Sequence, residues 1–225
     1  MPGNFIHLRT HSEFSLVDGL LRVKSLVAGA KENQQPAVAI TDKNNLYALV
    51  KFQKAAFSTG IKPVYGVDLE WIDDHGDEKD KDKDKEAVFT LTLLAQNLTG
   101  YKNLLKLVSR GYTEGQSTRG VHNRKSWIAD AAQGLIALSG ARAGDIGTAL
   151  DNGNPEQAIA AVEFWKKLFP DRFYIDIQRL GRVGDDEHVV AAVALAEKCG
   201  VPVVATNSCC FLSRNDYEAH EVRVC

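Results

Sequence analysis

Residues 5–19 have the sequence FIHLRTHSEFSLVDG, and the rest of the chain is organised around them. An apolar run alternates with polar side chains up to His11, and Asp18 follows shortly after. This pattern predicts a buried first strand followed by a loop. His7, Arg9 and His11 alternate along that strand and are therefore expected on one side of it. They are either binding groups at a strand end or ordinary core and rim side chains.

The composition limits the possible classes of protein. The chain has 225 residues and a formal net charge of −2, so it can bury a full core but is not the strongly basic chain typical of a free-standing nucleic-acid-binding module. It contains no run of about 18 apolar residues, and its start, MPGNFIHLR, lacks a signal-peptide pattern. Neither a disulfide framework nor a zinc ribbon is expected, because CxxC spacing is absent, and the predicted location is the cytoplasm. The four cysteines are Cys199, Cys209, Cys210 and Cys225.

Hydrophobic periodicity predicts an alternation of strands and helices along the chain. Residues 111–123 are rich in glycine and threonine and are expected to form a loop, and 214–223 are expected to be helical. The remaining strands are predicted at 37–40, 62–70, 88–95, 134–140, 172–178 and 201–207, and the helices at 20–34, 46–58, 101–110, from 126, 145–150, 154–169 and 187–199.

One segment cannot contribute to a core. Residues 73–86, DDHGDEKDKDKDKE, are almost wholly charged and are predicted to form a solvated, mobile loop. Its lysines nearly balance its acidic residues, which argues against an acidic metal-binding tail. No linker rich in proline or serine divides the chain, so residues 1–225 are predicted to form a single domain.

The alternation of elements predicts an α/β fold. A closed or nearly closed (β/α) barrel is the favoured architecture, and an open doubly wound sheet is the alternative. In a barrel, functional groups gather on the loops that follow the strands. Those loops contain His11, Asp18, Asp42, Lys43, Asp68, Ser139, Gly140 and the residues 207–210.

Several segments together resemble one known family. They are HLRTHSEFSLVDG, AITDKNNLYALVKF, GIKPVYGVDLE, LTLLAQNLTGYKNLLKL, LIALSG, FPDRFYIDIQRLGR and PVVATN, in this order. They resemble the PHP (polymerase and histidinol phosphatase) domain, in the version found at the N-terminus of the bacterial replicative DNA polymerase III alpha subunit. The resemblance implies a distorted seven-stranded (β/α) barrel. It also implies that residues 213–225 begin a connection toward polymerase domains outside this sequence.

Active members of the PHP family hold metal ions on His, Asp, Glu and sometimes Cys ligands and hydrolyse phosphoesters, with metal-bound hydroxide as the nucleophile. Carried across position by position, the resemblance places only three of these ligands, His11, Asp18 and Asp68. Other ligand positions are replaced by Arg9, Lys43, Thr90, Ala141 and Ser208, and the last one is Cys210. Arg9 and Lys43 place positive charge where cations would lie, and they can instead pair with nearby aspartates.

The resemblance therefore implies a degenerate site without metal and without catalytic residues. The alternative is a residual zinc or magnesium ion on His11, Asp18, Asp68 and Cys210. The adjacent Cys209 and Cys210 are interpreted as small packed side chains rather than a redox pair.

The sequence allows three functions. The leading hypothesis is a catalytically silent scaffold that docks the proofreading exonuclease subunit. The parent protein would be a DNA-directed DNA polymerase, a nucleotidyltransferase of DNA replication that uses Mg²⁺ and contacts DNA, and this domain would contact the rest of the alpha chain and the polymerase core. The second is an active metal-dependent phosphoesterase or 3′–5′ exonuclease. The third, an unrelated (β/α)-barrel enzyme acting on a phosphorylated substrate, is disfavoured because no glycine-rich phosphate loop follows the late strands.

Overall fold

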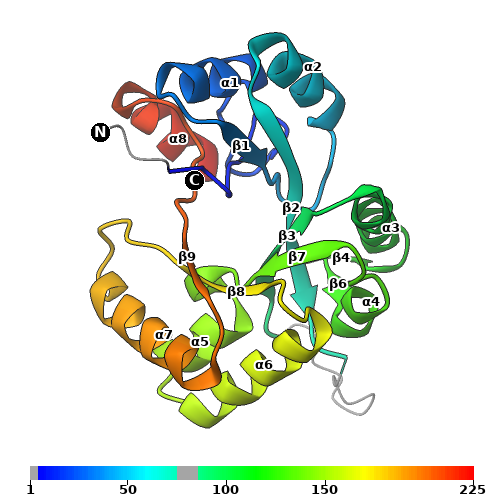
Figure 1. Cartoon of the computed structure of the whole chain (residues 1–225), viewed down its shortest axis with the longest axis vertical. Coiled ribbons are helices and arrows are strands. Elements are labelled where there is room, and N and C mark those ends of the chain that lie inside the picture. The colour runs from blue at the N-terminus through cyan, green and yellow to red at the C-terminus, as the bar shows by residue number, and fades with distance from the viewer. Residues whose placement is uncertain (1–4, 75–85) are drawn as a thin grey trace. The chain divides into compact units, whose positions relative to one another are not determined.

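The computed structural model describes residues 5–74 and 86–225 (Figure 1). The described chain separates into two compact units. The first contains the residues up to Asp68 together with Thr206–Cys225, and the second contains Leu69–Ala205. Most of the predicted 73–86 loop lies outside the described residues, and the prediction of a single domain stays a prediction.

The first unit is built from a strand–helix–strand motif with one helix before it. It contains α1 (Val23–Glu32), β1 (Ala37–Ile40), α2 (Leu49–Thr59) and the first part of β2 (Lys62–Ile72). β1 and β2 pair in parallel, as a crossover through a helix requires. α1 and α2 lie side by side (Figure 1). The unit ends with a 3₁₀ turn, η3 (Arg214–Asp216), and α8 (Tyr217–Val224).

The prediction of a buried first strand is wrong in detail. Residues 5–9 are extended but form no regular strand, and Phe5 is exposed. The segment is nevertheless held on both sides by backbone hydrogen bonds. On one side the Ala39 amide donates to the His7 carbonyl (2.9 Å), and on the other the His11 amide donates to the Cys209 carbonyl (2.8 Å). The alternating pattern detected an extended segment correctly, but its bonds are too irregular to form a ladder.

The second unit contains the remaining strands and five helices of the described chain. Its helices are α3 (Leu98–Glu114), α4 (Lys125–Asp130), α5 (Asp145–Asp151), α6 (Pro155–Leu168) and α7 (Asp185–Cys199), with a 3₁₀ turn, η2 (Ala141–Ala143). Its longer strands are β3 (Phe89–Ala95), β7 (Leu135–Leu138), β8 (Phe173–Ile177) and β9 (Val203–Ala205). In Figure 1, α5, α6 and α7 pack against one another.

The predicted loop at 111–123 is partly wrong. α3 continues to Glu114, and three short strands follow: β4 (Gln116–Ser117), β5 (Gly120–Val121) and β6 (Asn123–Arg124). β4 and β5 form a small antiparallel pair, whereas β6 pairs in parallel with the end of β2. Two-residue strands leave no periodic signal, so only backbone pairing in the folded chain reveals them.

Pairing connects the strands in the order β1-β2-β3-β7-β8-β9, with β6 also on β2, which makes a seven-stranded sheet. The predicted α/β class and strand number are confirmed, although β6 takes the place of the expected first strand. β7–β8 and β8–β9 are parallel, but β3 and β7 are antiparallel. The charged segment between β2 and β3 lacks an amphipathic helix pattern, so the strand–helix alternation that enforces parallel order is interrupted there.

Each unit has its own apolar core. In the first, Val38 and Phe52 are fully buried, and in the second Trp71 and Trp165 meet edge to face at 5.3 Å between ring centroids. The two tryptophans are therefore core side chains. Among the described residues, no helix is both long and apolar enough to cross a bilayer.

Candidate functional site

The candidate site lies within the first unit, on the loop that follows the extended segment. Residues 12–19 fold back on themselves: the Ser15 amide donates to the Ser12 carbonyl, and the Gly19 amide donates to the Ser15 carbonyl, both at 2.8 Å. A Cβ at position 19 would lie 1.8 Å from the Ser12 carbonyl oxygen. Only glycine permits this close approach, and the approach carries Asp18 back toward His11.

His11 is the centre of the site. Its ring is buried and lies between two carboxylates, with Nδ1 2.8 Å from Asp18 Oδ2 and Nε2 2.9 Å from Asp68 Oδ2. Burial acts to lower the His11 pKa, but hydrogen bonds to Asp18, Asp68 and Cys210 outweigh it and hold the pKa well above its usual value. Both ring nitrogens thus face carboxylate oxygens, so neither is open to a metal while these two contacts persist.

Arg9 occupies the other side of the Asp68 carboxylate. Its Nη2 and Nε lie 2.6 Å and 3.1 Å from Asp68 Oδ2, the oxygen that also accepts from His11. Burial raises the Asp68 pKa, but the charges of Arg9 and His11 overcome this and place the pKa far below its usual range. Of the pairs expected for Arg9, the one with Asp68 is confirmed. A cation that bound Asp68 Oδ2 would compete with Arg9 and His11 for this oxygen.

Asp18 completes a chain of alternating charges from Arg9 through Asp68 and His11. Burial raises the Asp18 pKa, but the hydrogen bond from His11, the Ser15 hydroxyl (2.7 Å) and the charge of Lys43 together lower it. The Lys43 amide also donates to the Ser15 hydroxyl at 3.2 Å. Lys43 therefore contributes positive charge beside the site, as predicted.

Asp42 has a structural role in the loop instead of pairing with Arg9. Its carboxylate accepts from the Ser12 amide at 2.6 Å and from the Ser12 hydroxyl at 2.8 Å. Burial raises the Asp42 pKa more than these bonds lower it. Neither Ser12 nor Ser15 was predicted as a site residue. Serines are common in loops, and no spacing in the sequence indicates that these two donate hydrogen bonds to the aspartates.

The other predicted positions divide between the two units. Cys210 Sγ lies 3.9 Å from His11 Nδ1, and one ligand atom each from His11, Asp18 and Cys210 fit within 4.8 Å of one another. Ser208 contributes only a backbone carbonyl, to the Cys210 thiol. Thr90, on β3, and Ala141, at the start of η2, belong to the second unit and supply no carboxylate, imidazole or thiol.

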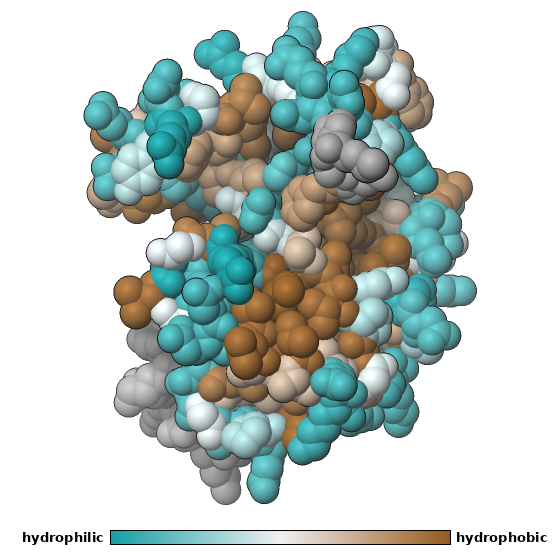
Figure 2. All heavy atoms as spheres, turned by 60° about the vertical axis from the view of Figure 1, so that its left-hand side comes forward, coloured by the Kyte–Doolittle hydropathy of each residue, from teal (hydrophilic) through white to brown (hydrophobic). Residues whose placement is uncertain are grey.

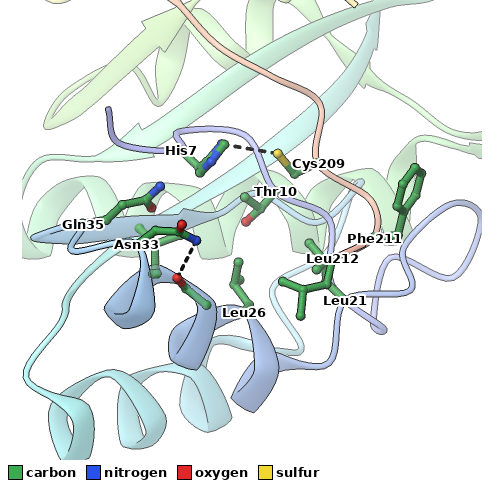
Figure 3. Close-up of a pocket in the computed structure, with 12 residues that line it drawn as sticks. His7, Thr10, Leu21, Leu26, Asn33, Gln35, Cys209, Phe211 and Leu212 are labelled. Atoms are coloured by element: carbon green, nitrogen blue, oxygen red, sulfur yellow. Dashed lines mark hydrogen bonds between the residues drawn. The ribbon is translucent and has the colours of Figure 1, made fainter. Parts of the chain in front are cut away.

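A separate hollow of about 200 Å³ lies beside this site in the first unit (Figure 3). His7 Nδ1 and Cys209 Sγ meet on its wall at 3.3 Å, and apolar side chains such as Leu26 and Leu212 complete it. Burial lowers the His7 pKa and raises that of Cys209 to about 11. The Cys209 thiol is therefore protonated at neutral pH, which agrees with its interpretation as a packed side chain rather than a nucleophile.

The described residues supply few of the groups that a cluster of several metal ions needs. Such a cluster needs many converging neutral imidazoles, thiolates and carboxylates. The described site instead offers one imidazole already hydrogen-bonded at both nitrogens, two carboxylates already paired, a thiol and two cationic side chains. What these residues form is a buried network of hydrogen bonds and ion pairs that joins the loop at 12–19 to the middle of β2.

Comparison with known proteins identifies the class. A model of the PHP domain matches residues 7–180, and the chain therefore belongs to the PHP domain family. Over 225 residues it is 47% identical to the DNA polymerase III subunit alpha of Pseudomonas aeruginosa, and over 221 residues it is 42% identical to that of Escherichia coli. These alignments cover 100% and 98% of this chain but only 18% of each relative.

Solved structures share the fold at low sequence identity. A protein of Bifidobacterium adolescentis described as a metal-dependent phosphoesterase superposes with a TM-score of 0.57 at 9% identity, covering 97% of this chain and 96% of that one. An amidohydrolase from Chromobacterium violaceum gives a TM-score of 0.55 at 14% identity, covering 98% and 97%. At these identities the likeness concerns the fold alone.

Proposed function

We propose that this chain is the PHP domain of a replicative DNA polymerase III alpha subunit and that the domain is a catalytically silent scaffold. The similarity to alpha subunits extends over the whole chain, which supports the first part. The parent protein would then be a DNA-directed DNA polymerase of the cytoplasm that uses Mg²⁺. Its polymerising residues would lie outside these 225 residues.

One observation carries the proposal of silence: both ring nitrogens of His11 and the Asp68 carboxylate are already engaged, in part by Arg9. Each of the two aspartates already has a partner among Arg9 and His11. Because Arg9 is always protonated, a metal entering here would meet a fixed positive charge in a buried environment. The network instead stabilises the loop at 12–19, which is what a scaffold requires.

The test is the metal content of the purified chain, combined with hydrolysis of a generic phosphodiester by the same sample. We expect well below one metal ion per chain and no hydrolysis after Mn²⁺ or Zn²⁺ is added. Two or three tightly held ions, with hydrolysis abolished by His11→Ala, would overturn the proposal. His188→Ala is the control, because His188 is another buried histidine hydrogen-bonded to an aspartate, Asp151, at 2.8 Å.

A second candidate is metal-dependent phosphoesterase activity from a single residual ion, which the convergence of His11, Asp18 and Cys210 favours. It requires His11 to carry no proton on Nδ1 and Asp18 to release that nitrogen. If this candidate holds, Zn²⁺ binds with a stoichiometry of one ion, and Cys210→Ser weakens binding by at least tenfold. Cys199→Ser, in the second unit, should leave binding unchanged.

The second part of the proposed scaffold role is docking of the separate proofreading exonuclease subunit. The near-neutral charge of the chain suits a protein partner better than direct, tight binding of DNA. Titration of the purified chain with the exonuclease subunit by calorimetry tests this role. We expect a saturable 1:1 complex, and the absence of heat and of co-elution at micromolar concentrations would contradict it.

A further inference from the structure

Helix α8 is the last element of the described chain, and it packs little of its surface. Every residue of α8 except His220 is exposed, and none is buried. Tyr217, Val222 and Val224 have exposed fractions of 52%, 81% and 49%. A helix shorter than about 12–15 residues is marginal in water unless tertiary packing supports it. The described chain therefore does not supply the packing that a helix of this length needs.

The exposed apolar side chains of α8 lie on more than one side of the helix. Tyr217 and Val224 are seven positions apart and share a face, whereas Val222 lies about 140° around the axis from Tyr217. α8 lies on the left of Figure 1, the side that Figure 2 brings forward, where apolar side chains stand among hydrophilic ones. A helix that is apolar on several sides is normally covered on several sides. We therefore look for a partner that surrounds α8 instead of touching one face.

A hydrogen bond joins α8 to the loop at 12–19. Arg223 Nη2 donates to the Leu16 carbonyl at 2.9 Å. Leu16 and Val17 follow each other in this loop and are exposed to 71% and 61%. Neighbouring exposed apolar side chains of this kind mark contact sites more often than single ones do. We call the combined area the α8 surface, and its apolar members are Leu16, Val17, Tyr217, Val222 and Val224.

The length of the relatives indicates what covers this surface. The alignments with the alpha subunits of Pseudomonas aeruginosa and Escherichia coli cover 100% and 98% of this chain but 18% of each relative, so more than four fifths of each relative lies outside them. A segment joined covalently to α8 through a short linker has an effective concentration of the order of millimolar beside it. A separate protein at micromolar concentration competes poorly with such a segment. A continuation of the same chain is therefore favoured over a separate subunit or a second copy.

We propose that the α8 surface is the contact surface for the part of the alpha subunit that continues the chain after α8. This inference rests on the proposed function, in which these residues belong to an alpha subunit. It also gives the buried network a role in the scaffold. His11 holds Asp18 at 2.8 Å and thereby fixes the loop whose Leu16 carbonyl receives Arg223. The network thus positions one part of the surface on which the continuing chain packs.

The experiment compares amide hydrogen exchange in the complete alpha subunit and in the 225-residue chain by mass spectrometry. We expect the amides of α8 to exchange at least about 100-fold more slowly in the complete subunit. Val222→Asp in the complete subunit should reduce this protection at least about tenfold. Val190→Asp is the matched control, because Val190 is 68% exposed on another helix, α7, and this variant should change the protection of α8 less than about twofold. Unchanged exchange of the α6 amides verifies that each variant remains folded.

The outcomes separate this inference from the function on which it rests. If the complete protein does not extend primed DNA, the proposed alpha-subunit identity fails and the inference fails with it. If it extends DNA but its α8 exchanges as fast as in the 225-residue chain, only the inference is wrong. Protection that appears only after the exonuclease is added, or only as the concentration of the 225-residue chain is raised, would identify a separate subunit or a second copy as the occupant and refute the inference. Equal effects of Val222→Asp and Val190→Asp would also refute it.

Discussion

Replacement of Arg9 by alanine tests whether the buried network stabilises the fold. Arg9 and Asp68 have side-chain exposures of 7% and 2%, so the substitution leaves a carboxylate inside the protein without its main cation. Removing one partner of a buried ion pair typically costs about 3–5 kcal/mol. His11 still donates to the same Asp68 oxygen, at 2.9 Å. We therefore expect the lower end of this range, a loss of about 3 kcal/mol in the free energy of unfolding.

The assay is urea denaturation followed by circular dichroism, with Asp68→Asn and the Arg9→Ala/Asp68→Asn double variant completing a cycle. Arg9→Ala should cost much less in the chain that already carries Asp68→Asn, because a neutral amide tolerates the loss of the guanidinium. Arg142→Ala is the control, because Arg142 also forms ion pairs with aspartate, here Asp151 and Asp185, but its side chain is 36% exposed. A loss below about 1 kcal/mol, or no coupling between the two positions, would refute the reasoning.

Three further predictions concern pH, backbone and core. His11 has a raised pKa in the folded chain, so its contribution to stability is complete below about pH 6.5 and is lost as the pH rises through the raised pKa. In urea titrations at several pH values, His11→Gln should make the free energy of unfolding fall less steeply with rising pH, and an unchanged pH profile would contradict this. Gly140→Ala should cost more than about 2 kcal/mol of stability, because φ is +79° and the new Cβ would lie 2.2 Å from a backbone oxygen. Gly153→Ala has φ +68° but open space around the Cβ and should cost about 1 kcal/mol, so equal losses of stability in thermal melting would argue against the clash. Trp165→Phe removes the 2.9 Å hydrogen bond from Nε1 to the half-buried Asp145 carboxylate and should cost about 1–3 kcal/mol in denaturant unfolding. A neutral effect would mean that other donors satisfy the carboxylate.

Local sequence patterns were sufficient to predict an element of secondary structure where the element is long and its burial is periodic. The strand predicted at 37–40 coincides with β1, and the helices of the second unit were located to within a few residues. The same patterns failed where pairing is brief or irregular, at residues 5–9 and at β6. Hydrophobic alternation reports on burial, whereas a strand is defined by hydrogen bonds to neighbours that are distant in sequence.

The sequence by itself determined the family and the replacement of ligand-type residues by Arg9 and Lys43. It also determined that Asp18 and Asp68 remained as candidate partners, because residue types at spaced positions are visible without coordinates. Only the tertiary structure decided which charged side chains pair. His11 lies between two carboxylates, and Arg9 pairs with Asp68, which is 59 positions away in the sequence. The choice depends on distances of a few ångströms in a buried space, where the gain from pairing must exceed the cost of removing each charge from water. That balance is set by the packing of the loop against β2, and no local pattern in the chain encodes it.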